Sequence, residues 1–292
     1  MSETITLDFD RLPSTLAAYA KALRARGQLD EGQTIPRIEA RVSGVVADPA
    51  KLRGYRTICG FADSDKLPVS FPQVLGFPLQ MMALTHPKFP LRLLGLVHVR
   101  NLITQYRPLD AREPLDFLAY VEGHRLVHNG IEFDIVTEVR DSNGTLAWKS
   151  LASTLSRGKG SGQRPAKKPA AARQLEFGRY ASWDVPENIG RRYGMNAGDV
   201  NPIHLSAFTA RLFGFKRAIA HGMWTMARCA AELGDELPKG PYSLSVAFKQ
   251  PVFLPSSVLM KYGPSENGVD FMLLSEDGEK SHLAGQVLAV KT

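Results

Sequence analysis

Residues 218–234, AIAHGMWTMARCAAELG, are apolar on nearly every side of a helix and end in a glycine. Such a run is typical of a buried helix that stops at its C-terminal glycine. Several strand-like runs follow, and an Asp277-Gly278 turn joins two of them. This part of the chain therefore predicts a sheet of antiparallel strands packed around one buried helix.

The same order of elements occurs earlier in the chain. Residues 73–84, QVLGFPLQMMAL, predict a second apolar helix, and the strand-like runs after it include an Asn143-Gly144 turn. We therefore predict an α+β fold of two units, each an antiparallel β-sheet wrapped around a long central helix. Ahead of the first unit, residues 14–26 predict an amphipathic surface helix. Its expected apolar face consists of Leu16, Tyr19, Ala20 and Leu23.

Most of the net charge of +7 lies in one segment. Residues 156–173 carry six basic residues and no acid, and they are rich in Gly, Pro, Ala and Ser, as mobile linkers are. The segment has no aromatic residue for base stacking, so a solvated tether is favoured over a nucleic-acid-binding arm. The expected divisions are an N-terminal helical segment (1–30), a first unit (31–155), the linker (156–173) and a second unit (174–292).

Composition narrows the class of protein further. A chain of 292 residues with 44% apolar content can form a sizeable core, and no run of apolar residues is long enough for a membrane span. Because the first thirty residues lack the features of a signal peptide, we expect a cytoplasmic protein without membrane association. Cys59 and Cys229 match no metal or disulfide pattern and are interpreted as buried free thiols.

Residues 198–204, GDVNPIH, place an acid, an amide and an imidazole around a proline. Residues five apart on a continuous helix are separated by about 140°, so Asp199 and His204 need a break between them to share a substrate. Pro202 supplies the break, Asn201 becomes an N-cap, and a helix is expected over 202–214. The two side chains can then converge. The alternative is purely structural, because Asn-Pro helix starts are common.

A second feature lies eighteen residues after His204, where Gly222 precedes the buried helix. The start of a helix offers unpaired N–H groups, and a glycine there allows a ligand to approach the backbone closely. These are the properties of a donor site for an oxyanion. A glycine before a helix is weak evidence taken alone.

The combination of GDVNPIH with FGFKRAIAHGM (213–223) and FKQPVFLP (248–255) resembles the MaoC-type (R)-specific enoyl-CoA hydratases and 3-hydroxyacyl-thioester dehydratases. With two units, the chain looks like the double-hotdog members of that family. The resemblance implies that Asp199 and His204 form the acid-base pair, that Asn201 orders the site, and that the Gly222 N–H is the oxyanion donor.

The first unit differs from the second at the corresponding positions. Aligning the two apolar helices places Phe77 opposite His221 and Pro78 opposite Gly222, and proline has no N–H to donate. No Asp-x-Asn-Pro-x-His motif precedes this helix. We therefore expect a non-catalytic first unit, and the resemblance implies that such a unit accommodates long or bulky acyl groups near Phe77.

The expected substrate is an acyl-CoA or acyl carrier protein thioester, and the reaction needs no metal or redox cofactor. Further contacts with the substrate are expected from His221 and Met223, which flank Gly222. The candidates for binding the CoA phosphates are Arg191, Arg192, Lys216, Arg217 and Lys249.

Two other functions stay open. A hotdog thioesterase would release free CoA, and a non-catalytic module would bind acyl-CoA or nucleic acid without chemistry. A homodimer is also possible, because exposed strands can pair two chains.

Overall fold

The computed structural model describes residues 4–22, 27, 29–30, 32–93, 95–158, 160 and 177–290. Its strands are β1 (Ile5–Phe9), β2 (Ile38–Val45), β3 (Leu96–Gln105), β4 (Leu115–Val121), β5 (Arg125–Val127), β6 (Gly130–Arg140), β7 (Leu146–Arg157), β8 (Arg179–Val185), β9 (Tyr242–Phe248), β10 (Ser256–Ser265), β11 (Gly268–Ser275) and β12 (Ser281–Ala289). Its helices are α1 (Thr15–Ala22), α2 (Pro49–Cys59), α3 (Phe71–Leu84), α4 (Ile189–Ala197), α5 (Ala207–Arg211) and α6 (Gly222–Leu233), with short 3-10 turns η1 (Pro202–His204) and η2 (Gly234–Glu236).

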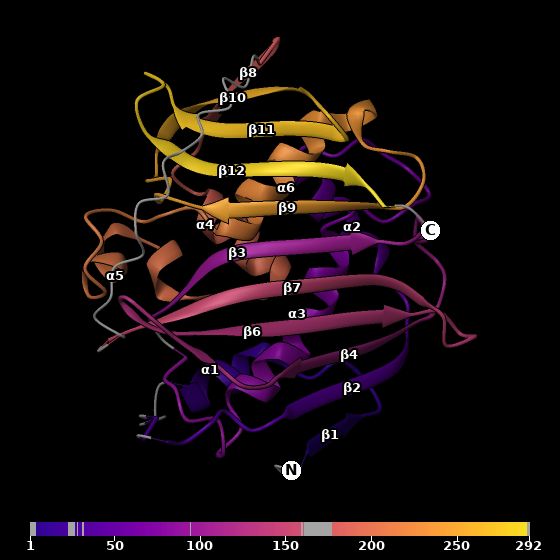
Figure 1. Ribbon diagram of the computed structural model, residues 1–292, viewed down its shortest axis with the longest axis vertical. Helices are drawn as coiled ribbons and strands as arrows, with labels where there is room; N and C mark the ends of the chain where they lie inside the picture. Colours follow the sequence, from indigo (N-terminus) through magenta and orange to yellow (C-terminus); the bar gives the residue numbers. More distant parts are fainter. Residues whose placement is uncertain are drawn as a thin grey trace.

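All twelve strands belong to one sheet, in the order β1-β2-β4-β6-β7-β3-β9-β12-β11-β10-β8, with β5 paired to β6. Strands before β8 form one half, and β8 to β12 form the other. The halves meet where β3 pairs antiparallel with β9, in a register that sets Ile103 opposite Leu244. Figure 1 shows the two halves stacked along the long axis of the molecule. The predicted two-unit α+β fold is confirmed, although β1 and β2 are parallel.

Each half of the sheet covers one long buried helix, and α3 and α6 lie on the same side of the sheet (Figure 1). On α3, Gly76 allows close packing, because a β-carbon there would lie 2.7 Å from the Thr137 side chain of β6. Gln80 on the same helix donates to the Thr137 hydroxyl at 2.8 Å. The α6 helix ends at Gly234, as its sequence predicts. Both helices are placed by apolar burial against the concave face of the sheet.

Two hydrogen bonds join the helices of one unit to those of the other. The Asn196 side chain of α4 donates to the Lys51 carbonyl of α2 at 3.0 Å, and the Trp224 indole of α6 donates to the Ile58 carbonyl at 3.0 Å. Most of the apolar core residues of both units also belong to one continuous cluster. The two units are therefore packed as a single body around the site described below.

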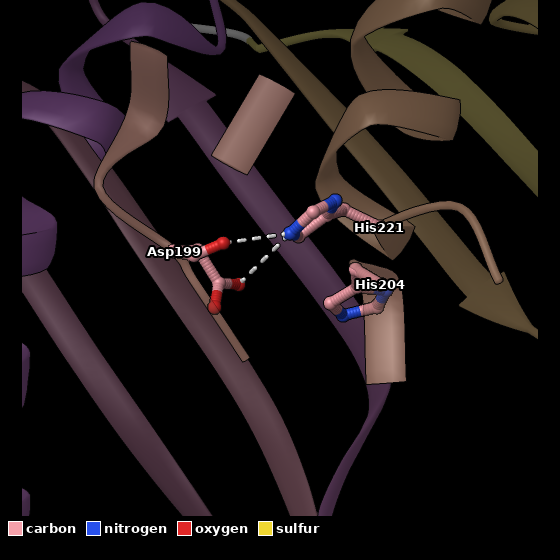
Figure 2. Close-up of side chains that lie close together, drawn as sticks. All are labelled: Asp199, His204 and His221. Carbon is pink, nitrogen blue, oxygen red and sulfur yellow. Dashed lines mark hydrogen bonds and ion pairs between the residues drawn. The ribbon is translucent and has the colours of Figure 1, made fainter. Parts of the chain in front are cut away.

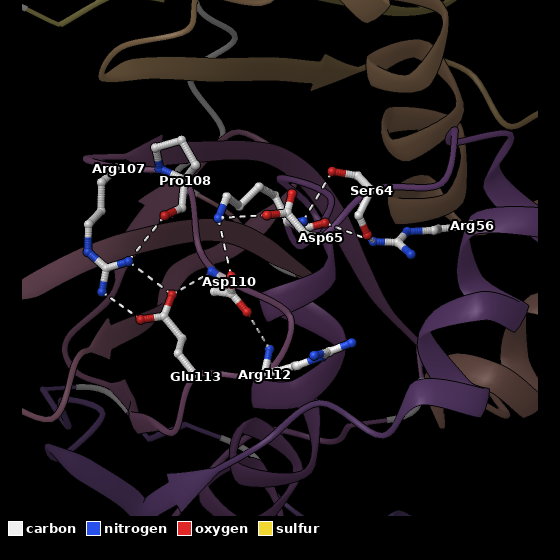
Figure 3. Close-up of polar contacts among 9 residues, drawn as sticks. Arg56, Ser64, Asp65, Arg107, Pro108, Asp110, Arg112 and Glu113 are labelled. Atoms are coloured by element: carbon white, nitrogen blue, oxygen red, sulfur yellow. Dashed lines mark hydrogen bonds and ion pairs between the residues drawn. The ribbon is translucent and has the colours of Figure 1, made fainter.

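A network of charged side chains orders the loops of the first unit (Figure 3). Arg107 binds the Glu113 carboxylate through two nitrogens, at 2.9 and 2.8 Å, and Glu113 accepts the Asp110 amide at 2.6 Å. Arg56, which is buried, donates to the Ser64 carbonyl at 2.6 Å. Bidentate arginine–carboxylate pairs of this kind fix the conformation of the loops that carry them. We therefore assign these residues a structural role.

The structure corrects the alignment of the two helices. Helix α3 begins at Phe71, after Ser70, so Phe77 and Pro78 lie inside it rather than at its start. The argument from Pro78 is therefore wrong, because the donors of a helix belong to its first turn, and the non-catalytic first unit stays a prediction. The error arose because an unbroken apolar run does not reveal where its helix begins.

Three local predictions also change. The helix expected over 202–214 is broken into η1 and α5, since Ser206 adopts an extended conformation and caps α5. In α1, Leu16 is exposed whereas Tyr19 is buried, and Leu23 lies outside the described residues. Ser156 and Arg157, assigned to the linker, complete β7. Except for Gly158 and Gly160, the rest of the linker lies outside the described residues.

Within the described ranges, every helix falls short of the length and apolar content that crossing a bilayer requires.

Candidate active site

The segment that carries the GDVNPIH motif lies across a glycine face of α4. A β-carbon at Gly190 would lie 2.0 Å from the His204 carbonyl oxygen, and one at Gly194 would lie 2.6 Å from the Asp199 carbonyl oxygen. Gly198 ends α4 in the left-handed conformation, with φ of 82°, and turns the chain toward Asp199. The motif is thus held by backbone contacts that only glycine permits.

Asn201 caps the short turn η1, as predicted, by accepting the Ile203 amide at 3.4 Å. His204 at the end of this turn is only 8% exposed. Its Nδ1 lies 2.8 Å from the Ile219 carbonyl oxygen. Because a carbonyl oxygen only accepts, Nδ1 carries the proton, and Nε2 is left as an acceptor.

His221 packs directly on His204, with ring centroids 3.6 Å apart. Its Nε2 donates to the Asp199 carbonyl oxygen at 2.9 Å and lies 3.8 Å from Asp199 Oδ2 (Figure 2). His221 is also the N-cap residue of α6. It therefore ties the motif segment to the start of the buried helix.

The Asp199 side chain is 29% exposed, so a substrate can reach it. Its Oδ1 accepts the Tyr19 hydroxyl at 2.5 Å and the Asn201 amide at 3.3 Å. Burial acts to raise the pKa of Asp199, but the neighbouring imidazoles of His221 and His204 and these hydrogen bonds outweigh it and lower the pKa below its ordinary value. Asp199 is therefore a carboxylate at neutral pH.

The two imidazoles take up a proton at a lower pH than exposed histidines do. Burial lowers the pKa of His204 to about 3, with a contribution from His221, and burial lowers the pKa of His221 as well. Both rings are neutral at pH 7. The site thus presents a carboxylate and a neutral imidazole, which are two proton acceptors, beside one another.

Asp199, His204 and Gly222 all line one cavity of about 390 Å³ between the two units. Gly222 is the first residue of α6, where the amide groups have no acceptor within the helix. A β-carbon at this position would lie 3.2 Å from the Phe248 ring. The start of α6, with amide groups that have no acceptor within the helix, therefore borders the cavity that Asp199 and His204 also line.

A second, narrower cavity of about 160 Å³ also reaches Asp199. Its wall is mostly apolar and comes largely from α3, β3, β6 and β7 of the first unit. Asp199, Asn201, His98 and Met223 line both cavities. Asp199 therefore lies where the smaller cavity, formed largely by the first unit, meets the larger cavity, formed mostly by the second unit.

A metal ion does not suit the cluster, although ligand atoms of Asp199, His204 and His221 lie within 4.8 Å of one another. A metal-binding imidazole must turn an unprotonated nitrogen toward the ion. His221 turns toward Asp199 the nitrogen that donates to a carbonyl, so its lone pair points elsewhere. The geometry favours proton transfer over metal binding.

Some of the residues predicted to contact the substrate line the two cavities, and others do not. Met223 and Phe77 line the cavities, and so does Lys249 among the five basic candidates. Arg191 and Arg217 instead donate to the carbonyls of Leu205 and Pro255. Arg192 and Lys216 are exposed outside both cavity walls.

Three titratable side chains that the first half of the chain contributes to the two cavities were not predicted as site residues from the sequence. Tyr19 comes from α1, Arg157 from the end of β7, and His98 from β3. His98 packs on Phe248 with centroids 5.0 Å apart, and burial lowers its pKa to about 4. None lies near the motif in sequence, and only the pairing of β3 with β9 and the packing of α1 bring them to it.

Comparisons with known proteins agree with this architecture. Residues 164–281 match the family model of the MaoC-like domain. The chain is 32% identical over 284 residues to 3-hydroxyacyl-thioester dehydratase X of Mycobacterium tuberculosis, covering 94% of this chain and 97% of the relative. The crystal structure of that bacterium's HtdX superposes with a TM-score of 0.75 at 29% identity, over 86% of this chain and 100% of the other.

A further M. tuberculosis protein, described as having a double hotdog fold, superposes with a TM-score of 0.55 at 10% identity. The superposition covers 91% of this chain and 96% of that protein's chain. Fold and comparisons together define a double-hotdog enzyme of the hydro-lyase class, a dehydratase or hydratase. The chain belongs to the MaoC-like dehydratase family.

Proposed function

We propose that the protein interconverts trans-2-enoyl-CoA and (R)-3-hydroxyacyl-CoA at Asp199 and His204. The observation that carries this proposal is the convergence of an ionised carboxylate, a neutral imidazole and the first amide of α6 on one cavity. The name of the relative, a 3-hydroxyacyl-thioester dehydratase, supports an acyl thioester as substrate.

In the hydration direction, a water molecule bridges Asp199 and His204. Ligand atoms of the pair lie within 4.8 Å, a gap that one water can span with hydrogen bonds of about 2.8 Å. Both groups start without an extra proton, so the water supplies the proton as well as the hydroxyl group. One member of the pair removes a proton from the water molecule while the water oxygen attacks C3 of the substrate. A proton is then delivered to C2 from the pair.

Negative charge develops on the thioester oxygen during this step. The Gly222 N–H at the start of α6 stabilises it by hydrogen bonding and through the positive end of the helix dipole. Dehydration uses the same groups in reverse, since one acceptor takes the C2 proton and its conjugate acid protonates the leaving hydroxyl. These residues supply every proton and charge contact of the reaction, so no metal or redox cofactor takes part.

The two cavities divide the substrate between them. The apolar cavity lined by Phe77 and Met81 takes the acyl chain. The larger cavity, with Lys249 and Arg157 in its wall, takes the CoA portion with its phosphates. Acyl carrier protein is the alternative carrier. The homodimer and the lack of a nucleic-acid partner stay predictions.

The test is to measure turnover of short and long trans-2-enoyl-CoA. The ultraviolet absorbance of the conjugated thioester monitors the reaction, and chiral analysis identifies the product. Asp199→Asn and His204→Ala should each lower kcat at least about 100-fold, the usual contribution of a general acid or base. Unchanged turnover in either variant would overturn the assignment. Release of free thiol would indicate a thioesterase, and binding without chemistry a non-catalytic module.

A further inference from the structure

A hydroxyl group from the N-terminal helix reaches the proposed catalytic carboxylate. Tyr19 lies on α1, 180 residues before Asp199, and its hydroxyl donates to Asp199 Oδ1 at 2.5 Å. The Tyr19 residue is 9% exposed and packs in a small apolar cluster with Ala18 and Met81. Because packing fixes the ring, its hydroxyl is held at one point on the carboxylate.

This contact makes the two oxygens of the carboxylate unequal. Oδ1 receives the Tyr19 hydroxyl and also the Asn201 amide, at 3.3 Å. Oδ2 instead faces the imidazole side of the site, 3.8 Å from His221 Nε2, which is too far for a hydrogen bond. The carboxylate cannot rotate without breaking both bonds at Oδ1, so Oδ2 stays turned toward the reacting groups.

Tyr19 does not itself exchange a proton in this arrangement. Burial and the negative charge of Asp199 raise the pKa of Tyr19 above its ordinary value, so the phenol keeps its proton. It therefore acts only as a donor. A hydrogen bond to a carboxylate stabilises the charged form, and the Tyr19 hydroxyl is one of the groups that lower the pKa of Asp199.

We propose that Tyr19 is a positioning residue, whose hydroxyl holds Oδ1 of Asp199 so that Oδ2 carries the proton transfers of the reaction. This inference rests on the proposed function, because it acts through Asp199. It also makes α1, which precedes the first unit, part of the working site of the second. The contact with α3 and the Met81 cluster places α1 there.

The test is Tyr19→Phe, which keeps the ring and removes only the hydroxyl. We expect kcat to fall about 10- to 100-fold, the effect of losing a hydrogen bond to a charged group, with KM within about twofold of wild type. We also expect the acidic limb of kcat/KM to move to higher pH. Rates are taken within seconds of a jump from pH 7 into more acidic buffers.

Tyr180→Phe is the matched control, since Tyr180 lies on β8 and is 62% exposed. Loss of its hydroxyl group should leave kcat, KM and the pH profile unchanged. Unchanged kcat and an unchanged pH profile in Tyr19→Phe would overturn the proposal. So would a joint change of kcat and KM with a lowered Tm and no movement of the acidic limb, which indicates a packing role.

Asp199→Asn is assayed in parallel to separate the two proposals. If Asp199→Asn loses turnover while Tyr19→Phe behaves as wild type, only the positioning role fails. If Asp199→Asn turns over normally, the proposed function fails and the role of Tyr19 falls with it.

Discussion

Gly194 of α4 touches the backbone of Asp199, and a β-carbon at position 194 would come within 2.6 Å of the Asp199 carbonyl oxygen. The same carbonyl oxygen accepts the His221 hydrogen bond at 2.9 Å. One glycine on α4 therefore lies against the carbonyl group that links the Asp199 segment to His221, the N-cap residue of α6.

Gly194→Ala should lower kcat about 100-fold, because displacing a reacting group by about 1 Å can cost that much. Alanine favours a helix by about 1 kcal/mol over glycine, but overpacking typically costs 1 to 3 kcal/mol. The free energy of unfolding should therefore stay level or fall while activity is lost. Steady-state kinetics and denaturant unfolding measure both.

The control is Gly240→Ala, because a β-carbon at this exposed position would meet nothing within 4 Å. It should keep wild-type kcat. Wild-type kinetics in Gly194→Ala would show that the motif segment can shift without harm.

Arg157→Ala should raise KM for CoA thioesters several-fold with little change in kcat, since a group that binds the carrier equally in ground and transition states affects KM. The same variant should act normally on N-acetylcysteamine thioesters, which have no phosphates. Arg192→Ala, exposed and outside both cavity walls, is the matched control. An equal loss on both thioesters would contradict phosphate binding by Arg157.

Phe77→Ala should raise the ratio of kcat/KM for long over short enoyl chains, because it enlarges the apolar cavity of about 160 Å³. Phe77→Trp should lower that ratio by filling the same space. Met82→Leu serves as control, since Met82 lies on the same helix outside the cavity wall. Ratios that do not move in opposite directions for the two variants would place the acyl chain elsewhere.

Acid should destabilise the fold below pH 6.5, partly through His98. Its pKa is about 4 in the folded protein, against 6.5 as the ordinary value. Between these values the unfolded chain binds more protons, so the free energy of unfolding falls as pH falls, by up to about 1.4 kcal/mol per pH unit for one such group. Above pH 6.5 His98 is neutral in both states and has no effect.

Denaturant unfolding between pH 7 and pH 4.5 measures this slope. His98→Gln should have a shallower slope than wild type, although His204 continues to contribute, with a pKa of about 3. Equal slopes in the two proteins would mean that His98 takes up a proton in the folded state at its ordinary pKa.

Much of the site could be predicted because its chemistry is local. Asp199, Asn201 and His204 lie within six positions, and Pro202 dictates the break that lets them converge. The repeated order of helix and strands likewise indicated two units, because hydrophobic periodicity reports burial directly. Where periodicity was missing, as in the uniformly apolar run of α3, the position of the helix start was misjudged.

By itself, the amino-acid sequence determined the two-unit fold and the motif around Pro202, since both depend on side-chain patterns between near neighbours. Only the tertiary structure decided that Tyr19 donates to Asp199 and that Arg157 and Lys249 share a cavity with His204. These contacts join residues from α1, from the end of β7 and from the loop after β9 to the motif. They depend on strand pairing and helix packing over long sequence separations, which no local pattern encodes.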